Sequence, residues 1–467
     1  MVSLASCSRS TMSNTLSSKY RNEDVSARLQ YMVNAMGEGD TLKIDQGEYL
    51  LSKVIQISGR SNLTIIANNA TLRTMDGAPV NKAHSILSIY NSKNISIEGL
   101  TCDGNRDTRI PKETFAHAVM IIDSDDITFD HMSVINSVVD GYYVASSKPD
   151  DLSYISKRIN FIECNAIGSY RNGLSIINGH DIMVDGGSYS ESKGTSPQAG
   201  IDVEANANSY IPGSRNIVFK NVHLEDNSGW GILVSQKGSP ENINIEECIF
   251  QNNLGGIKHT GSKSIINNND LMNCDFGIES IRYAGYNEDH NILVGNTIED
   301  CVVGIKYSGY GGLIEGNTIS NCSEKGIHLN GNTKDYTQVI ISKNVLDNAG
   351  LESIYAFNFK EANVIGNTIK NSKGLGVYMA YGKLLIEDNV FENLVHGINL
   401  IGSNTQVESN TFIEIKNRIA EFTERKGHPS SGRFDKNTII SSSKISDDQV
   451  VIAAKKVVLG NNLKKKR

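Results

Sequence analysis

A short phrase returns about every 21 to 32 residues through most of this chain: Gly, then an apolar residue that is usually Ile, then a variable residue and a second apolar one. Repeats of this length indicate stacked coils, in which no single repeat can bury its apolar face alone. The first apolar residue of the phrase is found at Tyr142, Leu174, Ile201, Ile232, Ile257, Ile278, Ile305, Ile327, Ile354, Val377 and Ile398.

A second phrase lies between these copies, an Asn followed by a short Ile- or Val-rich segment such as 216–219 or 242–245. Each period therefore holds two or three strands of three to five residues, with Gly, Asn or Asp at the corners. Helical and leucine-rich repeats fit this pattern poorly. The sequence predicts an all-β protein, a single-stranded parallel β-helix.

The unbroken period favours one elongated domain rather than several globular ones. We expect residues 1–20 to be disordered or to be a truncated signal or tether, residues 21–415 to form the solenoid, and residues 416–467 to form irregular last coils and a C-terminal cap. Residues 24–36 have apolar residues at helical spacing, which predicts an N-terminal helix that covers the first coil.

Composition supports short coils. The chain has 42 glycines against 7 prolines, which suits corners that need positive φ. An Asn recurs at one corner, and stacked Asn side chains can hydrogen-bond from coil to coil. We expect this structural role for Asn296, Asn317, Asn344, Asn367, Asn389 and Asn410.

A net charge of −7, with no basic cluster apart from residues 464–467, argues against nucleic acid as a partner. No apolar run is long enough to span a bilayer. The seven cysteines have no CxxC spacing, so we expect structural thiols, with Cys274, Cys301 and Cys322 stacked inside the coil. Cys7 ends a Leu-Ala-Ser-Cys stretch like a bacterial lipoprotein signal, which implies a lipid anchor on an exported protein.

Two segments sharpen the assignment. The stretch 103–107, Asp-Gly-Asn-Arg-Asp, looks like a segment in early coils of mannuronan C5-epimerases, and Arg171-Asn172-Gly173 with 200–204 resembles a pattern in bacterial β-helix proteins. The chain thus resembles the pectate-lyase-like right-handed parallel β-helix superfamily over roughly residues 40–415. That resemblance implies a polysaccharide lyase, glycoside hydrolase, epimerase or tailspike-like protein. The epimerases' Tyr-Gly-Phe-Asp-Pro-His phrase is absent at 140–145, which argues against their mechanism.

Side chains alternate between the faces of a strand, so identical offsets in successive coils form columns. With Ile201 inward, two outward columns form one long face. The first column contains Tyr143, Ser175, Asp202, Leu233, Lys258, Glu279, Lys306, His328, Tyr355, Tyr378 and Asn399. The second contains Ala145, Ile177, Glu204, Ser235, Thr260, Ile281, Ser308, Asn330, Phe357, Ala380 and Ile401.

The face has few carboxylates, and they are confined to its middle. Asp202 and Glu204 are two residues apart on one strand, so their Cα atoms are roughly 6.5 to 7 Å apart. An inverting glycosidase needs about 6.5 to 9.5 Å between its two carboxyl groups. We therefore expect these residues to be a catalytic acid/base pair, with Glu279 as an additional acid or base; the alternative is that outward carboxylates only solubilise the solenoid.

Other side chains on the face suit substrate binding. Lys258 and Lys306 could face carboxylates or sulfates of an acidic sugar, or could form a stabilising charge ladder with Glu279. Tyr143, Tyr355 and Tyr378 offer flat faces for sugar rings. The remaining candidates for substrate contact are Arg171, Ser175 and His328. Long excursions at 146–157, 188–198 and 205–214 border the carboxylate pair, as expected of specificity loops.

The sequence therefore predicts a secreted or surface-anchored enzyme that cleaves a complex or acidic polysaccharide, with hydrolysis favoured. The alternatives are a lyase or C5-epimerase of uronate polymers, and a non-catalytic carbohydrate-binding or phage tailspike module. No cofactor is expected; Ca²⁺ is possible, although it prefers six to eight oxygens and the face offers few. The sequence does not distinguish a monomer from a trimer.

Overall fold

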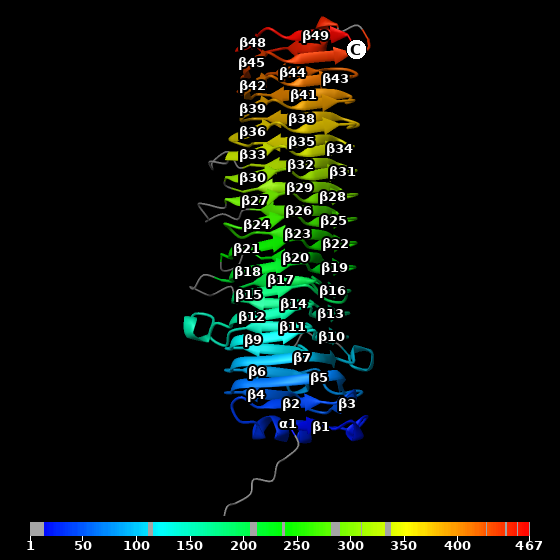
Figure 1. The fold of residues 1–467 in the computed structure, drawn as a ribbon. Coiled ribbons are helices and arrows are strands. Elements are labelled where there is room, and N and C mark those ends of the chain that lie inside the picture. The colour runs from blue at the N-terminus through cyan, green and yellow to red at the C-terminus, as the bar shows by residue number, and fades with distance from the viewer. Residues whose placement is uncertain are drawn as a thin grey trace, which may run out of the picture.

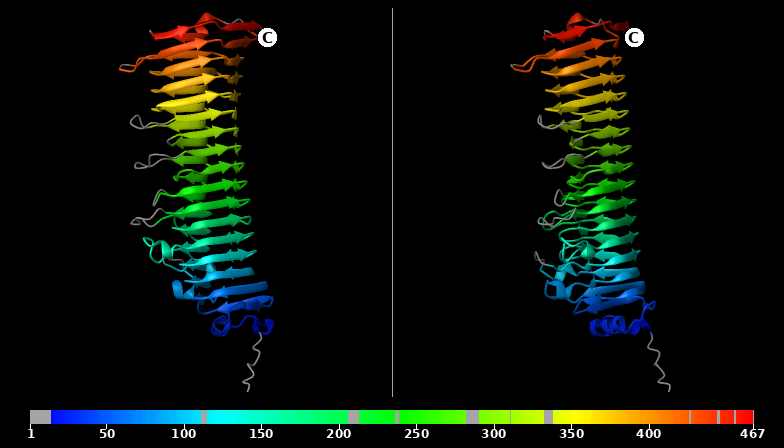
Figure 2. Two further views of the ribbon diagram at one scale, coloured as in Figure 1. Left: turned by 60° about the vertical axis from the view of Figure 1, so that its left-hand side comes forward. Right: turned by 90° about the vertical axis from the view of Figure 1, so that its left-hand side faces the viewer.

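The computed structural model describes residues 14–110, 115–205, 213–235, 239–281, 290–309, 311–331, 338–425, 427–443, 446–454 and 456–466. These residues form a right-handed parallel β-helix, as predicted, in which coils stack into a long column (Figure 1). Figure 2 shows from two further sides that the stack continues along the whole molecule. All the pairings between its named strands are parallel, and they build three sheets along the column.

The phrase that opens with Gly forms sheet B, whose 16 strands carry the predicted functional face. Its strands are β4 (Ile55–Ser58), β6 (Leu87–Tyr90), β8 (Val119–Ile122), β11 (Tyr142–Ala145), β14 (Leu174–Ile177), β17 (Ile201–Glu204), β20 (Trp230–Val234), β23 (Gly255–His259), β26 (Phe276–Ile281), β29 (Val303–Ser308), β32 (Lys325–Asn330), β35 (Glu352–Phe357), β38 (Leu375–Ala380), β41 (His396–Ile401), β44 (Ala420–Thr423) and β47 (Val450–Ile452).

The phrase that opens with Asn contributes to sheet A, which has 22 strands because two long early strands join it to the first strands of the third side. Its strands are β1 (Thr15–Leu16), β2 (Thr41–Ile44), β3 (Gly47–Leu51), β5 (Ser61–Thr74), β7 (Lys93–Asp103), β9 (Asp125–Asp130), β10 (Ser133–Ile135), β12 (Lys157–Ile162), β13 (Asn165–Ile167), β15 (His180–Asp185), β16 (Tyr189–Ser190), β18 (Arg215–Lys220), β21 (Glu241–Glu246), β24 (Ile265–Asn267), β27 (Asn291–Val294), β30 (Gly312–Glu315), β33 (Gln338–Ser342), β36 (Glu361–Ile365), β39 (Lys383–Glu387), β42 (Asn404–Glu408), β45 (Ser431–Asp435) and β48 (Lys456–Leu459).

Sheet C forms the third side in the later coils and has 11 short strands. They are β19 (His223–Glu225), β22 (Ile249–Gln251), β25 (Asp270–Met272), β28 (Thr297–Glu299), β31 (Thr318–Ser320), β34 (Val345–Asp347), β37 (Thr368–Lys370), β40 (Val390–Glu392), β43 (Thr411–Ile413), β46 (Thr438–Ser441) and β49 (Leu463–Lys466). Inward side chains of the three sheets make one continuous apolar core.

The predicted N-terminal helix is present as α1 (Ser26–Ala35) and lies across the start of the stack (Figure 1). Leu29 and Val33 on its inner face are 2% and 1% exposed, so the helix covers the apolar end of the first coil, as expected. Short 3₁₀ turns occur in connections: η1 (Ser18–Tyr20), η2 (Lys82–His84), η3 (Arg106–Thr108), η4 (Leu152–Tyr154) and η5 (Asp447–Gln449).

The solenoid extends further at both ends than we expected from the sequence. Within the segment 1–20, β1 pairs with β2, so residues 15 and 16 belong to the coils. Cys7 lies outside the described residues. After residue 415, strands β44 to β49 continue the three sheets in register up to Lys466. The repeat phrases become irregular there, but the parallel backbone pairing continues.

The glycines of the repeat phrase serve a purpose other than the one we expected. None of Gly141, Gly173, Gly277 and Gly304 has positive φ. A Cβ on Gly277 would instead lie 2.6 Å from the carbonyl oxygen of Gly304 in the next coil, and the other three would meet a neighbouring carbonyl at a similar distance. The phrase therefore repeats Gly because adjacent coils approach too closely for a side chain.

The Asn ladder is confirmed. Each buried amide donates from Nδ2 to Oδ1 of the Asn in the next coil, at 2.9 Å from Asn296 through Asn389 and at 3.0 Å from Asn410 to Asn437. Cys274, Cys301 and Cys322 are buried free thiols on successive coils, as expected. Both columns stabilise the stack and leave the outward face of sheet B free for other uses.

Candidate active site

The first outward column of sheet B is confirmed residue by residue. Strand register aligns Tyr143 with Ser175, then Asp202, Leu233, Lys258, Glu279, Lys306, His328, Tyr355, Tyr378 and Asn399. The same pairings continue the column toward the N-terminus through Met120, Ser88 and Gln56. Adjacent strands are about 4.8 Å apart, so the predicted site residues span many coils and fall into three groups.

The first group is a polar cluster over β11, β14 and β17, and its centre is Asp140, a fully buried carboxylate just before β11. Arg171 donates to both of its oxygens, from Nε at 2.8 Å and from Nη2 at 2.9 Å. Oδ2 also accepts from the hydroxyl of Ser175 at 2.9 Å, and Nδ1 of His117 lies 3.0 Å from it. Burial alone would raise the pKa of Asp140, but His117 and Arg171 hold that pKa below its usual value.

Asp202 lies beside this cluster, and its pKa is shifted in the opposite direction from that of Asp140. Its carboxyl is 3% exposed and accepts one hydrogen bond at Oδ2, from Nδ2 of Asn172 at 3.2 Å. Its Oδ1 is buried and has no hydrogen-bond partner among the described residues. Burial, reinforced by the charge of Glu204, raises the pKa of Asp202 to about 8, with Arg171 opposing the shift. At neutral pH Asp202 is therefore a neutral carboxylic acid with a proton to donate.

Glu204 and Tyr143 border the same cluster. Glu204 is the last residue of β17 and is partly exposed, in contrast to Asp202 two residues earlier. The ring of Tyr143 stacks on His117 with centroids 3.9 Å apart and planes 5° apart. Burial and the charge of Asp140 raise the pKa of Tyr143 to about 12, so its hydroxyl stays protonated. The predicted residues brought together here are Tyr143, Arg171, Ser175, Asp202 and Glu204.

Three members of the cluster were not predicted: His117, Asp140 and Asn172. They occupy the same place on successive coils, immediately before the strands of sheet B, as backbone bonds from Ala118 to Asp140 and from Gly141 to Asn172 show. This position lies in a connection, where the alternation of strand side chains does not predict which way a side chain points. Its consecutive polar residues were the signal available in the sequence.

The second group is a charge ladder. Glu279 is 5% exposed and lies between two lysines, with Oε2 3.2 Å from Nζ of Lys258 and Oε1 2.6 Å from Nζ of Lys306. Each lysine also lies 5.4 Å from an aromatic centroid, Lys258 over Trp230 and Lys306 over Phe276. This is the geometry of the stabilising ladder, because both cations already share one carboxylate. Leu233 separates the ladder from Asp202 in the column.

The third group is aromatic. Tyr355 and Tyr378 stack with centroids 5.1 Å apart and planes 7° apart, and His328 meets Tyr355 edge-on. Burial together with Lys325 and Lys306 lowers the pKa of His328 to about 4, so its imidazole is uncharged at neutral pH. This group lies five or more coils from Asp202. Glu352, the first residue of β35, is close enough for its charge to act on both tyrosines.

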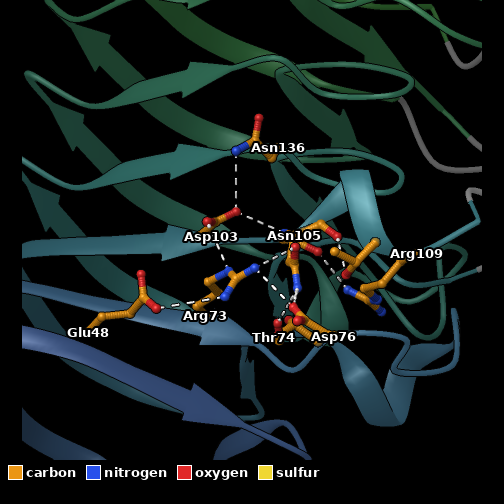
Figure 3. A network of polar contacts seen from close by, with 10 residues as sticks. Glu48, Arg73, Thr74, Asp76, Asp103, Asn105, Arg109 and Asn136 are labelled. Carbon is orange, nitrogen blue, oxygen red and sulfur yellow. Dashed lines mark hydrogen bonds and ion pairs between the residues drawn. The ribbon is translucent and has the colours of Figure 1, made fainter. Parts of the chain in front are cut away.

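The Asp-Gly-Asn-Arg-Asp segment forms a structural junction in the early coils (Figure 3). Asn105 has φ of 52° and donates from Nδ2 to Thr74 O at 2.9 Å and to Asp76 Oδ1 at 2.8 Å. Arg73 donates to Oδ1 of Asn105 at 3.0 Å. Arg109 is 4% exposed, and its guanidinium bonds four backbone carbonyls, those of Ala78, Pro79, His84 and Gly104. The segment therefore fixes the connection between β5 and β6.

Two further properties bear on the site. Across the described ranges, no group of three or more His, Cys, Asp or Glu side chains is placed to hold a metal ion. None of the helices in the described part of the chain is long and apolar enough to cross a membrane.

Comparison with known proteins agrees with the geometry of the coils. The sequence model of the family described as "Right handed beta helix region" matches residues 85–279, 208–369 and 304–462. These overlapping matches cover most of the chain, which therefore belongs to that family. The chain is also 22% identical over 423 residues to the uncharacterized protein YclG of Bacillus subtilis (strain 168), covering 82% of this chain and 68% of YclG.

A solved structure shows the same fold. The N-terminal fragment of bacteriophage phi29 gene product 12 superposes with a TM-score of 0.53 at 12% identity, covering 90% of this chain and 85% of the fragment. The catalytic domain of a GH87 alpha-1,3-glucanase, solved with tetrasaccharides, gives a TM-score of 0.46 at 12% identity, covering 82% of this chain and 65% of that domain. At 12% identity the likeness to the phage protein is one of fold alone.

Proposed function

We propose that this protein cleaves glycosidic bonds of a polysaccharide by hydrolysis over β11, β14 and β17. The observation that carries the proposal is the pairing on one strand of a buried, neutral carboxylic acid, Asp202, with a more exposed carboxylate, Glu204. Enzymes that break glycosidic bonds use two carboxyl groups whose environments push their pKa values apart.

In this mechanism Asp202 is the general acid. Its Oδ1 is unpartnered among the described residues, so the proton is not already committed to a neighbouring protein group. Donation to the glycosidic oxygen lets the leaving sugar depart as an alcohol. Glu204 then acts as the base that removes a proton from the attacking water, since the roughly 6.5 to 7 Å between Cα atoms at i and i+2 on a strand leaves room for that water.

The buried cluster positions the acid. Asp140 holds Arg171 and Ser175, and Asn172 bonds both Ser175 Oγ at 3.1 Å and Asp202 Oδ2 at 3.2 Å. The amide of Asn172 therefore fixes one oxygen of Asp202 and leaves the other for the substrate. Because Asp202 is 3% exposed, substrate binding must move the groups that cover it.

That burial also favours a second candidate, a non-catalytic glycan-binding module in which Asp202 is only structural. The stacked pair Tyr355 and Tyr378 and the ring of Tyr143 would then provide the binding surface. A lyase receives less support, since Arg171 is bound to Asp140 and Lys258 to Glu279, which leaves neither cation free to neutralise a uronate.

The test is incubation of the purified protein with neutral, uronic-acid and sulfated polysaccharides, following reducing ends and the ultraviolet absorbance of unsaturated sugars. We expect new reducing ends without absorbance, lost in Asp202→Asn and in Glu204→Gln and retained in Asp270→Asn, an exposed carboxylate on sheet C. Absorbance would indicate a lyase. Binding without cleavage of any polymer would indicate the binding module.

A further inference from the structure

A large groove lies on the outward face of sheet B at its N-terminal end. It has a volume of about 1180 Å³ and runs over β4, β6 and β8 under one edge of α1. Gln56, Ser88 and Met120 of the first outward column line it, as do Tyr90 and Ile122 of the second. Small-molecule pockets are about 300–1,000 Å³, so the groove suits a segment of a longer ligand.

The rim of the groove is positively charged. Lys53, Arg60 and Lys82 line it, and none of the described lining residues is Asp or Glu. The guanidinium of Arg60 bonds the backbone carbonyls of Asn34 and Met36 at the end of α1, and it forms no ion pair with a carboxylate of the described residues. Lys53 and Lys82 form no ion pair with a described carboxylate. This contrasts with Lys258 and Lys306, which share Glu279.

A fourth basic side chain lies close to these cations. His84 also lines the groove, and its Nδ1 lies 2.9 Å from Oδ1 of Asn81. Burial, Arg109 and Lys53 all lower the pKa of His84, and no acidic group in the described part of the chain opposes them. Cations gathered on a concave surface without counter-charges attract an anionic ligand.

The wall that carries Lys82 and His84 is held rigidly. Arg109 binds the carbonyls of Ala78, Pro79 and His84, and Asn105 ties the preceding strand to Asp76 (Figure 3). The 75–86 connection is thereby fixed on both sides of its exposed turn. Because this wall is already ordered, ligand binding loses less conformational entropy there.

The groove lies on the same face as the candidate active site, a few coils away from it. Met120 in its floor pairs with Tyr143, which is followed by Ser175 and Asp202 in the column. Three coil steps of about 4.8 Å separate Met120 from Asp202, a distance of roughly 14 Å. Phe115 lies between the groove and the Asp140 cluster. It lines the groove, and its ring centroid is 6.2 Å from that of Tyr143 and 5.8 Å from that of His117.

We propose that this groove binds an anionic segment of the glycan chain whose cleavage is assigned to Asp202 and Glu204. Lys53 and Lys82 face carboxylates or sulfates of the sugars, while the exposed rings of Tyr90 and Phe115 contact ring faces. The inference rests on the proposed function for the identity of the chain but not for the existence of the site. It moves the acidic-sugar subsite from Lys258 and Lys306 to the N-terminal end of the same face.

The experiment measures binding of three hexasaccharides by calorimetry: hexagalacturonate, its fully methyl-esterified neutral form, and a sulfated carrageenan hexamer. Glu204→Gln protein is used as the background, and chromatography verifies that each hexamer stays intact. The test variant adds Lys53→Gln and Lys82→Gln. The matched control adds Lys43→Gln and Lys456→Gln, two exposed lysines on sheet A with the same change of charge.

We expect an anionic hexamer to bind more tightly than the neutral one, and the Lys53/Lys82 variant to weaken that binding about tenfold, as the loss of two exposed ion pairs implies. The neutral hexamer and the control variant should show no change, and added salt should remove the preference. The tighter of the two anionic hexamers identifies carboxylate or sulfate as the anion.

The proposal is overturned if no anionic hexamer binds, if neutral and anionic hexamers bind equally, or if the control variant weakens binding as much as the test variant. Cleavage of a polysaccharide with binding unaffected by the Lys53/Lys82 changes would retain the proposed function and reject the groove. Lysine-dependent binding without cleavage of any polymer would reject the proposed function and retain the groove.

Discussion

At the scale of single residues, the protonation state of Asp202 is the property from which catalysis is argued. Its pKa of about 8 means that the acid form predominates at neutral pH and is lost as the pH rises past that value. We therefore expect kcat/KM to fall above about pH 8, and Asp202→Asn to lower kcat by about 10²- to 10⁴-fold. Initial rates on the cleaved polymer from pH 5 to 10 measure both.

The matched control for that profile is Asp270→Asn, which should keep the wild-type rate and the fall above pH 8. An unchanged alkaline limb in Asp202→Asn, or a rate within twofold of wild type, would show that Asp202 is structural. The buried hydrogen bond from Asn172 would then be its whole role.

His259 is a second buried residue whose pKa is shifted. It is fully buried on β23, and neither ring nitrogen has a hydrogen-bond partner among the described residues. Burial lowers its pKa to about 4 from an ordinary value of 6.5. Below pH 6.5 the unfolded chain takes up a proton that the folded chain refuses, so the free energy of unfolding should fall between pH 6.5 and 4, by about 3 kcal/mol in total.

His259→Leu should remove that component, so that its urea midpoint depends less on pH over this window than the midpoint of wild type. The exposed His223 on sheet C supplies the control, since His223→Asn should follow wild type. Parallel midpoint curves for wild type and His259→Leu would contradict the assignment.

At the scale of elements, the Asn ladder links consecutive turns of the later coils. Asn344 donates to Asn367 Oδ1 and to the carbonyl of Ile314, each at 2.9 Å, and its own Oδ1 accepts from Nδ2 of Asn317. Asn344→Ala leaves buried groups unpaired on both neighbouring coils. Each such group costs about 1–3 kcal/mol, so we expect a loss of about 2–4 kcal/mol in the free energy of unfolding.

Thermal and urea unfolding of Asn344→Ala measure this loss. Asn404→Ala, at an exposed position on β42, should stay within about 0.5 kcal/mol of wild type. Equal effects at the two positions would mean that the ladder adds nothing beyond an ordinary surface amide.

At the scale of the whole molecule, the sequence was sufficient to predict the solenoid because coil stacking depends on local periodicity. The strand offsets that aligned Tyr143 with Asp202 also placed Tyr378 correctly, seven coils further on. His117, Asp140 and Asn172 were missed because they lie in connections just before the strands, where the alternation of strand side chains does not predict which way a side chain points. The groove was missed for a related reason: its wall is an insertion between β5 and β6, fixed by contacts with Arg109 that no repeat pattern encodes.

A solenoid also distributes its stability locally, since each coil contacts only its neighbours. Leu29 and Val33 of α1 cover the first coil and pack into the core there. Leu29→Ala with Val33→Ala should therefore increase amide hydrogen exchange in β2 to β6, while exchange in β35 to β43 stays at the wild-type level. Tyr31→Ala on the exposed face of the same helix is the control, since Tyr31 is 59% exposed. Uniform acceleration along the chain would instead show that the coils unfold as one cooperative unit, and the cap would then stabilise Asp202 and the candidate site from five coils away.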